Sequence, residues 1–232
     1  MPEVFKSIEI TPRSLRGEYE LTDTLQLMID SGVAVGYHFC SSWYNVTYPW
    51  ELLDVNTQLM DGIRALNGGV IEDNTVIKDQ VRIGLNTLVR SGSYITGPVI
   101  IGNNCDIGPN CYIRSSTFIG DNCRVGSGVE IKNSIIMSGT NVPHLSYIGD
   151  SIIGESCNLG AGTQVANLKL DNSVITVGGQ QSVRYKLGVI MGDNVRTGIN
   201  SSINPGTVIG NGVFIGPGAQ ATGVIADGAR LF

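Results

Sequence analysis

The sequence is poor in charge and in long apolar runs, and each shortage removes a class of protein. Only 15% of the 232 residues are charged and the net charge is −5, so the chain lacks the clustered excess of Lys and Arg that nucleic-acid binding needs. No apolar run approaches the roughly 20 residues of a membrane-spanning helix. A signal peptide has a basic start followed by an apolar core, and residues 1–10 do not have this pattern. We therefore expect a cytoplasmic protein that binds neither nucleic acid nor membrane.

Cysteine is also scarce. The five cysteines are an odd number without paired spacing, which argues against a disulfide framework and favours a reducing compartment. Glycine, with 31 residues, is the one abundant residue type that stands out.

The first 69 residues have the pattern of a small α/β segment. Thr22 is a candidate N-cap for a helix whose apolar residues recur at helical spacing. Residues 33–39 form a strand candidate, and residues 41–46 a weaker one. Pro49 suits the first turn of a second helix.

From residue 70 to residue 232 the period becomes six. Eleven aliphatic residues recur without a miss, and four positions after each of the first ten stands a small residue, Thr, Ser, Cys or Val. A fixed short period indicates a solenoid, here a parallel β-helix in which three hexapeptides make one coil of about 18 residues. The aliphatic positions are Ile71, Ile77, Ile83, Val89, Ile95, Ile101, Ile107, Ile113, Ile119, Val125 and Ile131.

The solenoid frame assigns a place to most of the remaining residues. The aliphatic side chains fill the interior, and backbone groups pair between successive coils. Glycine often follows the aliphatic residue, as at Gly84 and Gly102, and is expected to accommodate the bend. Four cysteines fall at the small inward position and are read as small buried hydrophobes rather than metal or redox groups. They are Cys105, Cys111, Cys123 and Cys157.

The repeat is interrupted in its second half. Its register breaks after Met137, and a segment at about 168–188 does not follow the period before sixes return at Met191. We interpret this segment as a loop ejected from the solenoid, and such loops are where function concentrates.

Several stretches resemble a known family. His144–Asp150 and Asn158–Thr163, set in the hexapeptide frame, resemble the acetyltransferase half of the bifunctional N-acetylglucosamine-1-phosphate uridylyltransferase/glucosamine-1-phosphate acetyltransferase. Residues 186–188 and 192–200 are similar to its archaeal versions. The wider resemblance is to hexapeptide acyltransferases, and it implies a mainly β fold with a left-handed parallel β-helix. The handedness comes from the resemblance alone.

The N-terminal part extends the resemblance. Residues 16–23 and 43–53 are similar to the last stretch of a sugar-phosphate nucleotidylyltransferase domain. We therefore divide the chain into a remnant of such a domain, residues 1–69, and a β-helix over 70–232.

The resemblance implies an acetyl-CoA-dependent N-acetyltransferase that acts on an amino-sugar 1-phosphate of the glucosamine-1-phosphate type, in nucleotide-sugar biosynthesis. In the family a histidine accepts a proton from the sugar's 2-amino group as that nitrogen attacks the thioester of acetyl-CoA. His144 matches this residue. Histidine suits the role because it exchanges protons near neutral pH.

Seven further residues match family positions at the site. Arg114 and Lys132 are 18 residues apart, so the repeat stacks them on one side of adjacent coils. Two cations so placed are costly without an anion, which favours a phosphate site. By resemblance, Arg114, Lys132 and Tyr147 hold the sugar phosphate, Asn158 and Asn167 lie near the sugar and thioester, and Ala161 and Lys186 contact the cofactor. The resemblance also implies a homotrimer with sites between subunits.

Other functions remain to be weighed. Nucleotidylyl transfer by this chain alone is not expected, because no Gly-rich phosphate loop precedes Arg16 and Asn45 stands where the family has a metal-binding Asp. A non-catalytic assembly subunit, paired with a full-length nucleotidylyltransferase, is the alternative, with Trp43, Tyr44 and Trp50 as candidate contacts. The carbonic anhydrases that share the fold need three His ligands per zinc, and the chain has two histidines in all, so no metal site is expected.

Overall fold

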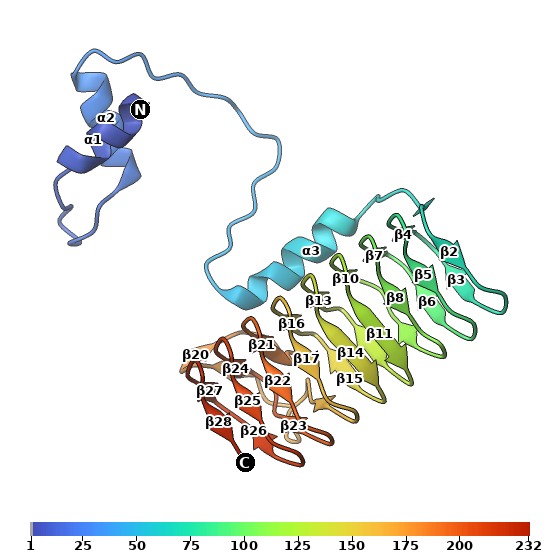
Figure 1. Ribbon diagram of the computed structural model, residues 1–232. Helices are drawn as coiled ribbons and strands as arrows, with labels where there is room; N and C mark the ends of the chain where they lie inside the picture. The colour runs from blue at the N-terminus through green and yellow to red at the C-terminus, as the bar shows by residue number, and fades with distance from the viewer. Residues whose placement is uncertain (1) are drawn as a thin grey trace. The chain divides into compact units, whose positions relative to one another are not determined.

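The hexapeptide repeats wind into a parallel β-helix, as their period predicts, and its left hand is the one that the family resemblance implies. The computed structural model describes residues 2–232, and in it the chain visits three parallel sheets in turn, so that each sheet receives one short strand per coil (Figure 1). Sheet A contains β1 (Leu66–Asn67), β4 (Val81–Ile83), β7 (Val99–Ile101), β10 (Thr117–Ile119), β13 (Ile135–Ile136), β16 (Ile152–Ile153), β21 (Val189–Met191), β24 (Thr207–Ile209) and β27 (Val224–Ile225).

The other two faces are built in the same way. Sheet B contains β2 (Val70–Ile71), β5 (Leu88–Val89), β8 (Asp106–Ile107), β11 (Arg124–Ser127), β14 (Asn141–His144), β17 (Asn158–Leu159), β22 (Arg196–Thr197), β25 (Phe214–Ile215) and β28 (Arg230–Leu231). Sheet C contains β3 (Val76–Lys78), β6 (Tyr94–Thr96), β9 (Tyr112–Ile113), β12 (Glu130–Lys132), β15 (Tyr147–Gly149), β18 (Gln164–Val165), β23 (Ser202–Ile203) and β26 (Gln220–Ala221). We call the turns from sheet B to sheet C the B–C corner, and those from sheet C to sheet A the C–A corner.

The interior is a stack of the predicted aliphatic side chains. In sheet C, Ile95 pairs with Ile113, which pairs with Ile131, which pairs with Ile148, and all four are fully buried. The four in-frame cysteines are buried beside them and free, as expected. Ile71 and Ile77 are the exceptions, exposed and partly buried respectively, because their strands lie in the first coil and pair on one side only.

Asparagine forms many of the bends, alongside glycine. Asn86, Asn104 and Asn122, one coil apart, each adopt a positive φ between 55° and 58°, a conformation that asparagine tolerates better than other residues with side chains. Gly84 serves a different purpose. A Cβ there would lie 2.5 Å from the carbonyl carbon of Gly102 in the next coil, so glycine at this position permits close approach of two coils rather than the bend.

One helix packs on the β-helix. A 3₁₀ turn, η1 (Pro49–Glu51), leads into α3 (Leu52–Met60), with proline in the first turn as predicted. The helix lies against sheet A (Figure 1), and its Asn56 side chain donates a hydrogen bond of 2.9 Å to the carbonyl of Ser116. Trp50 and Leu53 are buried there, so the prediction that Trp50 is a candidate contact for a partner chain is wrong.

The loop at 168–188 leaves the C–A corner after β18 and carries a small hairpin. Its strands are β19 (Thr176–Val177) and β20 (Gln180–Gln181), joined by Gly178 and Gly179, both at positive φ, as a tight two-residue hairpin turn requires. Ile175, Val177 and Leu187 of this loop are buried in one apolar cluster with Trp50 and Leu53 of the helical segment.

Residues up to Asn45 form a separate unit, and Val46–Phe232 form the other. In the first unit α1 (Glu3–Ile10), which the sequence reasoning missed, packs against α2 (Leu21–Asp30). Thr22 lies inside α2, whose N-cap is Glu20. The strands expected over 33–39 and 41–46 are wrong, because neither segment has a partner strand within residues 2–232. No helix in that range is long and apolar enough to cross a membrane.

Two isoleucines of one coil test this description of the core. Ile203 is 1% exposed and Ile199 is 56% exposed. Replacing Ile203 by Ala should lower the free energy of unfolding by about 2–5 kcal/mol, because it opens a cavity that neighbouring coils cannot fill. The same change at Ile199 should stay within about 0.5 kcal/mol. Urea denaturation followed by circular dichroism measures both, and equal losses would contradict the inward assignment.

Candidate functional site

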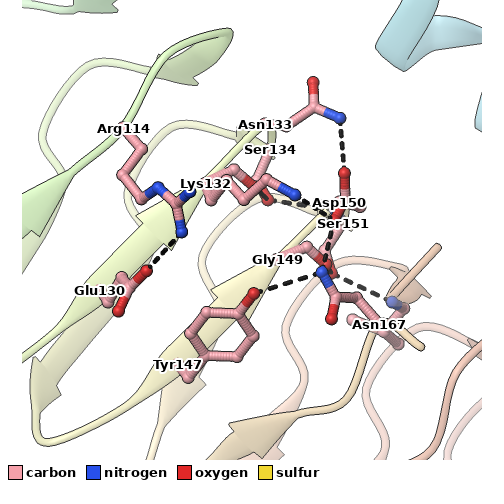
Figure 2. Close-up of polar contacts among 11 residues, drawn as sticks. Arg114, Glu130, Lys132, Asn133, Ser134, Tyr147, Gly149, Asp150, Ser151 and Asn167 are labelled. Carbon is pink, nitrogen blue, oxygen red and sulfur yellow. Dashed lines mark hydrogen bonds and ion pairs between the residues drawn. The ribbon is translucent and has the colours of Figure 1, made fainter. Parts of the chain in front are cut away.

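A row of polar side chains runs along sheet C, next to the C–A corner. Glu130 pairs with Tyr112, and Lys132 pairs with Gly149. The backbone N–H of Arg114 donates to Ile131, so Arg114 lies beside Lys132 on the next coil, as their spacing predicts. Arg114, Lys132, Tyr147 and Asn167 thus come from four successive coils (Figure 2).

Both cations of this row have carboxylate partners within the chain. Nη1 of Arg114 lies 2.9 Å from Oε1 of Glu130, and Nζ of Lys132 lies 3.1 Å from Oδ2 of Asp150. The argument from two uncompensated cations is therefore wrong, because each already has a counterion. Glu130 and Asp150 were missed in the sequence reasoning, although Asp150 ends the motif that carries the resemblance.

Asp150 connects the row. The residue is 3% exposed, and its carboxylate accepts hydrogen bonds from Lys132, from Nδ2 of Asn133 at 2.7 Å and from Nδ2 of Asn167 at 2.5 Å. A buried carboxylate needs such compensation, since its desolvation is costly. Its position at the C–A corner, with φ of +50°, turns the side chain toward the neighbouring coils on both sides (Figure 2).

Gly149 leaves room for the tyrosine of the row. A Cβ at this position would lie 2.5 Å from the Tyr147 hydroxyl and 2.7 Å from Nδ2 of Asn167. Asn167 donates to that hydroxyl at 3.2 Å, so the hydroxyl hydrogen is available for another acceptor. Partial burial, followed by the charges of Asp150 and Glu130, raises the pKa of Tyr147. The phenol therefore stays protonated and able to donate.

His144 lies at the end of β14, at the B–C corner, with its side chain exposed. Its carbonyl accepts hydrogen bonds from Oγ of Ser146 and from the N–H of Gly162, which fix the backbone. The next residue, Leu145, has φ of +51° and a largely exposed side chain, a strained conformation for leucine. Such strain persists where the surroundings impose it, and it concentrates at functional sites.

A hollow of about 500 Å³ lies along the same corner. Leu145, Ala161 and Ile199 line it, from three successive coils. Ala161, predicted to contact the cofactor, is therefore on the corner that carries His144.

Two predicted residues lie elsewhere on the chain. Asn158 is on sheet B, in a separate hollow of about 330 Å³ that Arg196 and Phe214 also line. Lys186 is exposed on the ejected loop, where its backbone bridges Leu168. One chain thus gathers Arg114, Lys132, Tyr147 and Asn167 on sheet C, and His144 with Ala161 on the B–C corner. Within residues 2–232, no group of three or more His, Cys, Asp and Glu side chains is arranged to hold a metal ion.

Comparison with known proteins first identifies the class. The GMPPB C-terminal domain model matches residues 95–198, and the bacterial transferase hexapeptide model, of six repeats, matches residues 188–223. With the observed fold, these two matches identify residues 95–223 as hexapeptide-repeat β-helix sequence. Among solved structures, UDP-N-acetylglucosamine acyltransferase from Campylobacter jejuni aligns with 69% of this chain and 71% of its own, at 12% identity and a TM-score of 0.40.

Curated relatives narrow the class. The chain is 45% identical to the bifunctional protein GlmU of Methanocaldococcus jannaschii over 92% of its length. It is 41% identical, over 94%, to the bifunctional sugar-1-phosphate nucleotidylyltransferase/acetyltransferase of Sulfurisphaera tokodaii. These matches cover 53% and 55% of the relatives, so the chain spans about half their length. The resemblance to the acetyltransferase region of archaeal bifunctional proteins is thereby confirmed.

The tyrosine of the row gives a pH-dependent test. Because the pKa of Tyr147 is raised above the ordinary value of 10.0, its ionisation should reduce stability as the pH rises from 10 through the folded-state value. Tyrosine ionisation can be followed by ultraviolet absorbance as the pH is raised. Subtracting the titration curve of Tyr147→Phe from that of the native protein should leave one transition, that of Tyr147, above pH 10. In denaturant the transition in the same difference curve should move to the ordinary tyrosine pKa. A native transition at or below pH 10 would contradict the environment described for this phenol.

Proposed function

We propose that the chain is an acetyl-CoA-dependent N-acetyltransferase that acts on an amino-sugar 1-phosphate of the glucosamine-1-phosphate type, in nucleotide-sugar biosynthesis. One observation carries the proposal: Arg114, Lys132 and Tyr147 form a row on sheet C, and Tyr147 lies only three residues after an exposed histidine at the adjoining corner. The names of the relatives, which include acetyltransferase and GlmU, support the same reaction.

The row is suited to the phosphate of the acceptor. Arginine has five N–H donors and lysine three, so Arg114 and Lys132 can bind phosphate oxygens while they keep their carboxylate partners. Glu130 and Asp150 hold the two cations in place, which lowers the cost of ordering them when the sugar binds. The protonated Tyr147 supplies a third donor.

His144 is the proposed base. As the sugar amine forms its C–N bond to the thioester carbonyl carbon, the C–S bond breaks and the sulfur leaves as the thiol of CoA. The amine nitrogen must lose a proton in this step, and histidine is the residue most often used for such transfers. An exposed side chain on a fixed backbone can reach a bound sugar without rearrangement of the coil.

The remaining residues complete the site. Asn167 is close enough to Tyr147 to contact the sugar, and Ala161 lies on the corner along which the pantetheine would run. Asn158 and Lys186 come from other faces of the chain. We infer a homotrimer, in which a neighbouring subunit brings these residues opposite His144; a cyclic assembly of identical chains can form three such sites.

A second function is favoured by one observation. Trp43 is 81% exposed, and Tyr37 and Phe39 are similarly exposed in the same segment. Exposed aromatic side chains of this kind mark protein contacts. They fit a non-catalytic subunit that binds a full-length nucleotidylyltransferase, and the first prediction below separates the two functions.

The proposed reaction can be measured as thiol release from acetyl-CoA in the presence of glucosamine-1-phosphate or galactosamine-1-phosphate. Release should depend on one of these sugars and fall by about 10²–10⁴-fold in His144→Ala, the range for loss of a general base. His38→Ala changes the other histidine of the chain and should behave as the native protein. A folded protein that releases no thiol with either sugar would favour the assembly-subunit function instead.

If each site is shared between two subunits of the trimer, a further prediction follows. His144→Ala and Lys186→Ala should each be impaired alone, but subunits of the two variants, mixed by unfolding and refolding together, should recover part of the activity. Recovery follows because a mixed trimer contains sites with His144 from one subunit and Lys186 from its neighbour. Each variant refolded alone is the control, and a mixture no more active than these controls would contradict a site shared in this way.

A further inference from the structure

The ejected loop, residues 168–188, is fixed to the sheet C row where it returns. The N–H of Leu187 donates to the carbonyl of Asn167 at 3.0 Å, and the N–H of Gly188 donates to the carbonyl of Asp150 at 2.8 Å. Lys186 is paired with Leu168 through an isolated antiparallel bridge. Any displacement of this part of the loop would therefore move the backbone of Asn167, whose side chain contacts Tyr147.

The other side of the loop is fixed to helix α3. Leu187 is fully buried, in the apolar cluster that contains Trp50 and Leu53. Arg184 forms an ion pair of 2.5 Å with Asp54 of the helix, and the arginine side chain is 17% exposed. The positive charge of Arg184 also contributes to the lowered pKa of Glu51, after the backbone amides of Tyr48 and Thr47. The arginine thus faces the acidic side of the helical segment.

The backbone just before these anchors is strained. Val183 has φ of +54° and an exposed side chain, a conformation that is a genuine outlier for a β-branched residue. On one side, the Oγ of buried Ser182 donates to Ile175 at 2.7 Å and accepts from the N–H of Arg184. On the other, the Arg184 carbonyl accepts from Ile175 at 2.8 Å. Strain of this kind persists only where the surroundings determine the conformation, so the loop has one imposed shape.

We propose that helix α3 positions the acceptor site from outside it. Asp54 holds the loop through Arg184, and Leu53 of the same helix lies with Leu187 in one apolar cluster. Asn167 and Lys186 thereby keep the places that the reaction needs. Arg184 and Asp54 are positioning residues, since they reach the site only through the loop. The inference rests on the proposed function for its kinetic consequence, whereas the physical link between helix and loop is independent of it.

Variants of the ion pair between Arg184 and Asp54 test the link between helix α3 and the loop. Arg184→Met should speed amide hydrogen exchange across residues 182–188 and lower kcat/KM for the sugar phosphate by roughly two- to thirtyfold, the range expected for residues that act through others. Asp54→Arg should do the same. The double variant Asp54→Arg with Arg184→Asp restores an ion pair of opposite polarity and should recover slow exchange and most of the lost kcat/KM.

Asp106→Asn is the matched control. It breaks a different ion pair, one that joins two coils through Arg90 at 2.6 Å, and should leave loop exchange and kcat/KM unchanged. Native-like loop exchange in Arg184→Met, or a double variant at least as impaired as Asp54→Arg alone, would overturn the proposal. The exchange is measured without either substrate, so it judges the link between helix and loop even if native protein transfers no acetyl group, a result that would refute only the proposed function.

Discussion

The parallel pairing of each coil with the next is the constraint on which this structure depends. A single coil cannot bury its aliphatic side chains or satisfy its backbone groups, so each strand takes both its hydrogen bonds and its packing from neighbours one coil away. Residues one coil apart therefore meet on the surface whether or not they have any chemistry in common. Arg114 and Lys132 meet in this way, and so do Asn86 and Asn104, whose side chains hydrogen bond at 3.2 Å.

This constraint explains how much the sequence could predict. The inward aliphatic positions, the buried cysteines and the stacking of Arg114 on Lys132 all follow from counting in sixes. Family resemblance adds the handedness and the matching of His144 and Tyr147, because the period itself carries neither. The first unit was predicted less well. Its helices and its extended segment obey no repeat, and weak strand propensity over 33–46 has no partner strand in the described chain to realise it.

What could not be predicted lies where the count of six fails. Ile131 to Ile136 and Ile148 to Ile153 are steps of five, and each shortened step leaves a corner residue, Asn133 or Asp150, at positive φ. The shortened corners bring these side chains within hydrogen-bonding distance, at 2.7 Å. The carboxylate that compensates Lys132 arises from the same irregularity. A search for the six-residue period loses the repeat at such a break. In this chain the break is the place where hydrogen bonds connect the polar row.

The next turn of the C–A corner, after Asn167, is where the loop is inserted. A shortened turn and an inserted segment are two departures from the repeat at one edge of the solenoid, and Asp150 contacts both, through the side chain of Asn167 and the N–H of Gly188. Regular coils generate flat faces, which hold a small ligand poorly because they cannot surround it. The irregular corner supplies the relief that a binding site needs. Helix α3 belongs to the same unit as the β-helix and packs on sheet A beside that corner, so a segment that precedes the hexapeptide repeats contributes to the packing around the irregular turn.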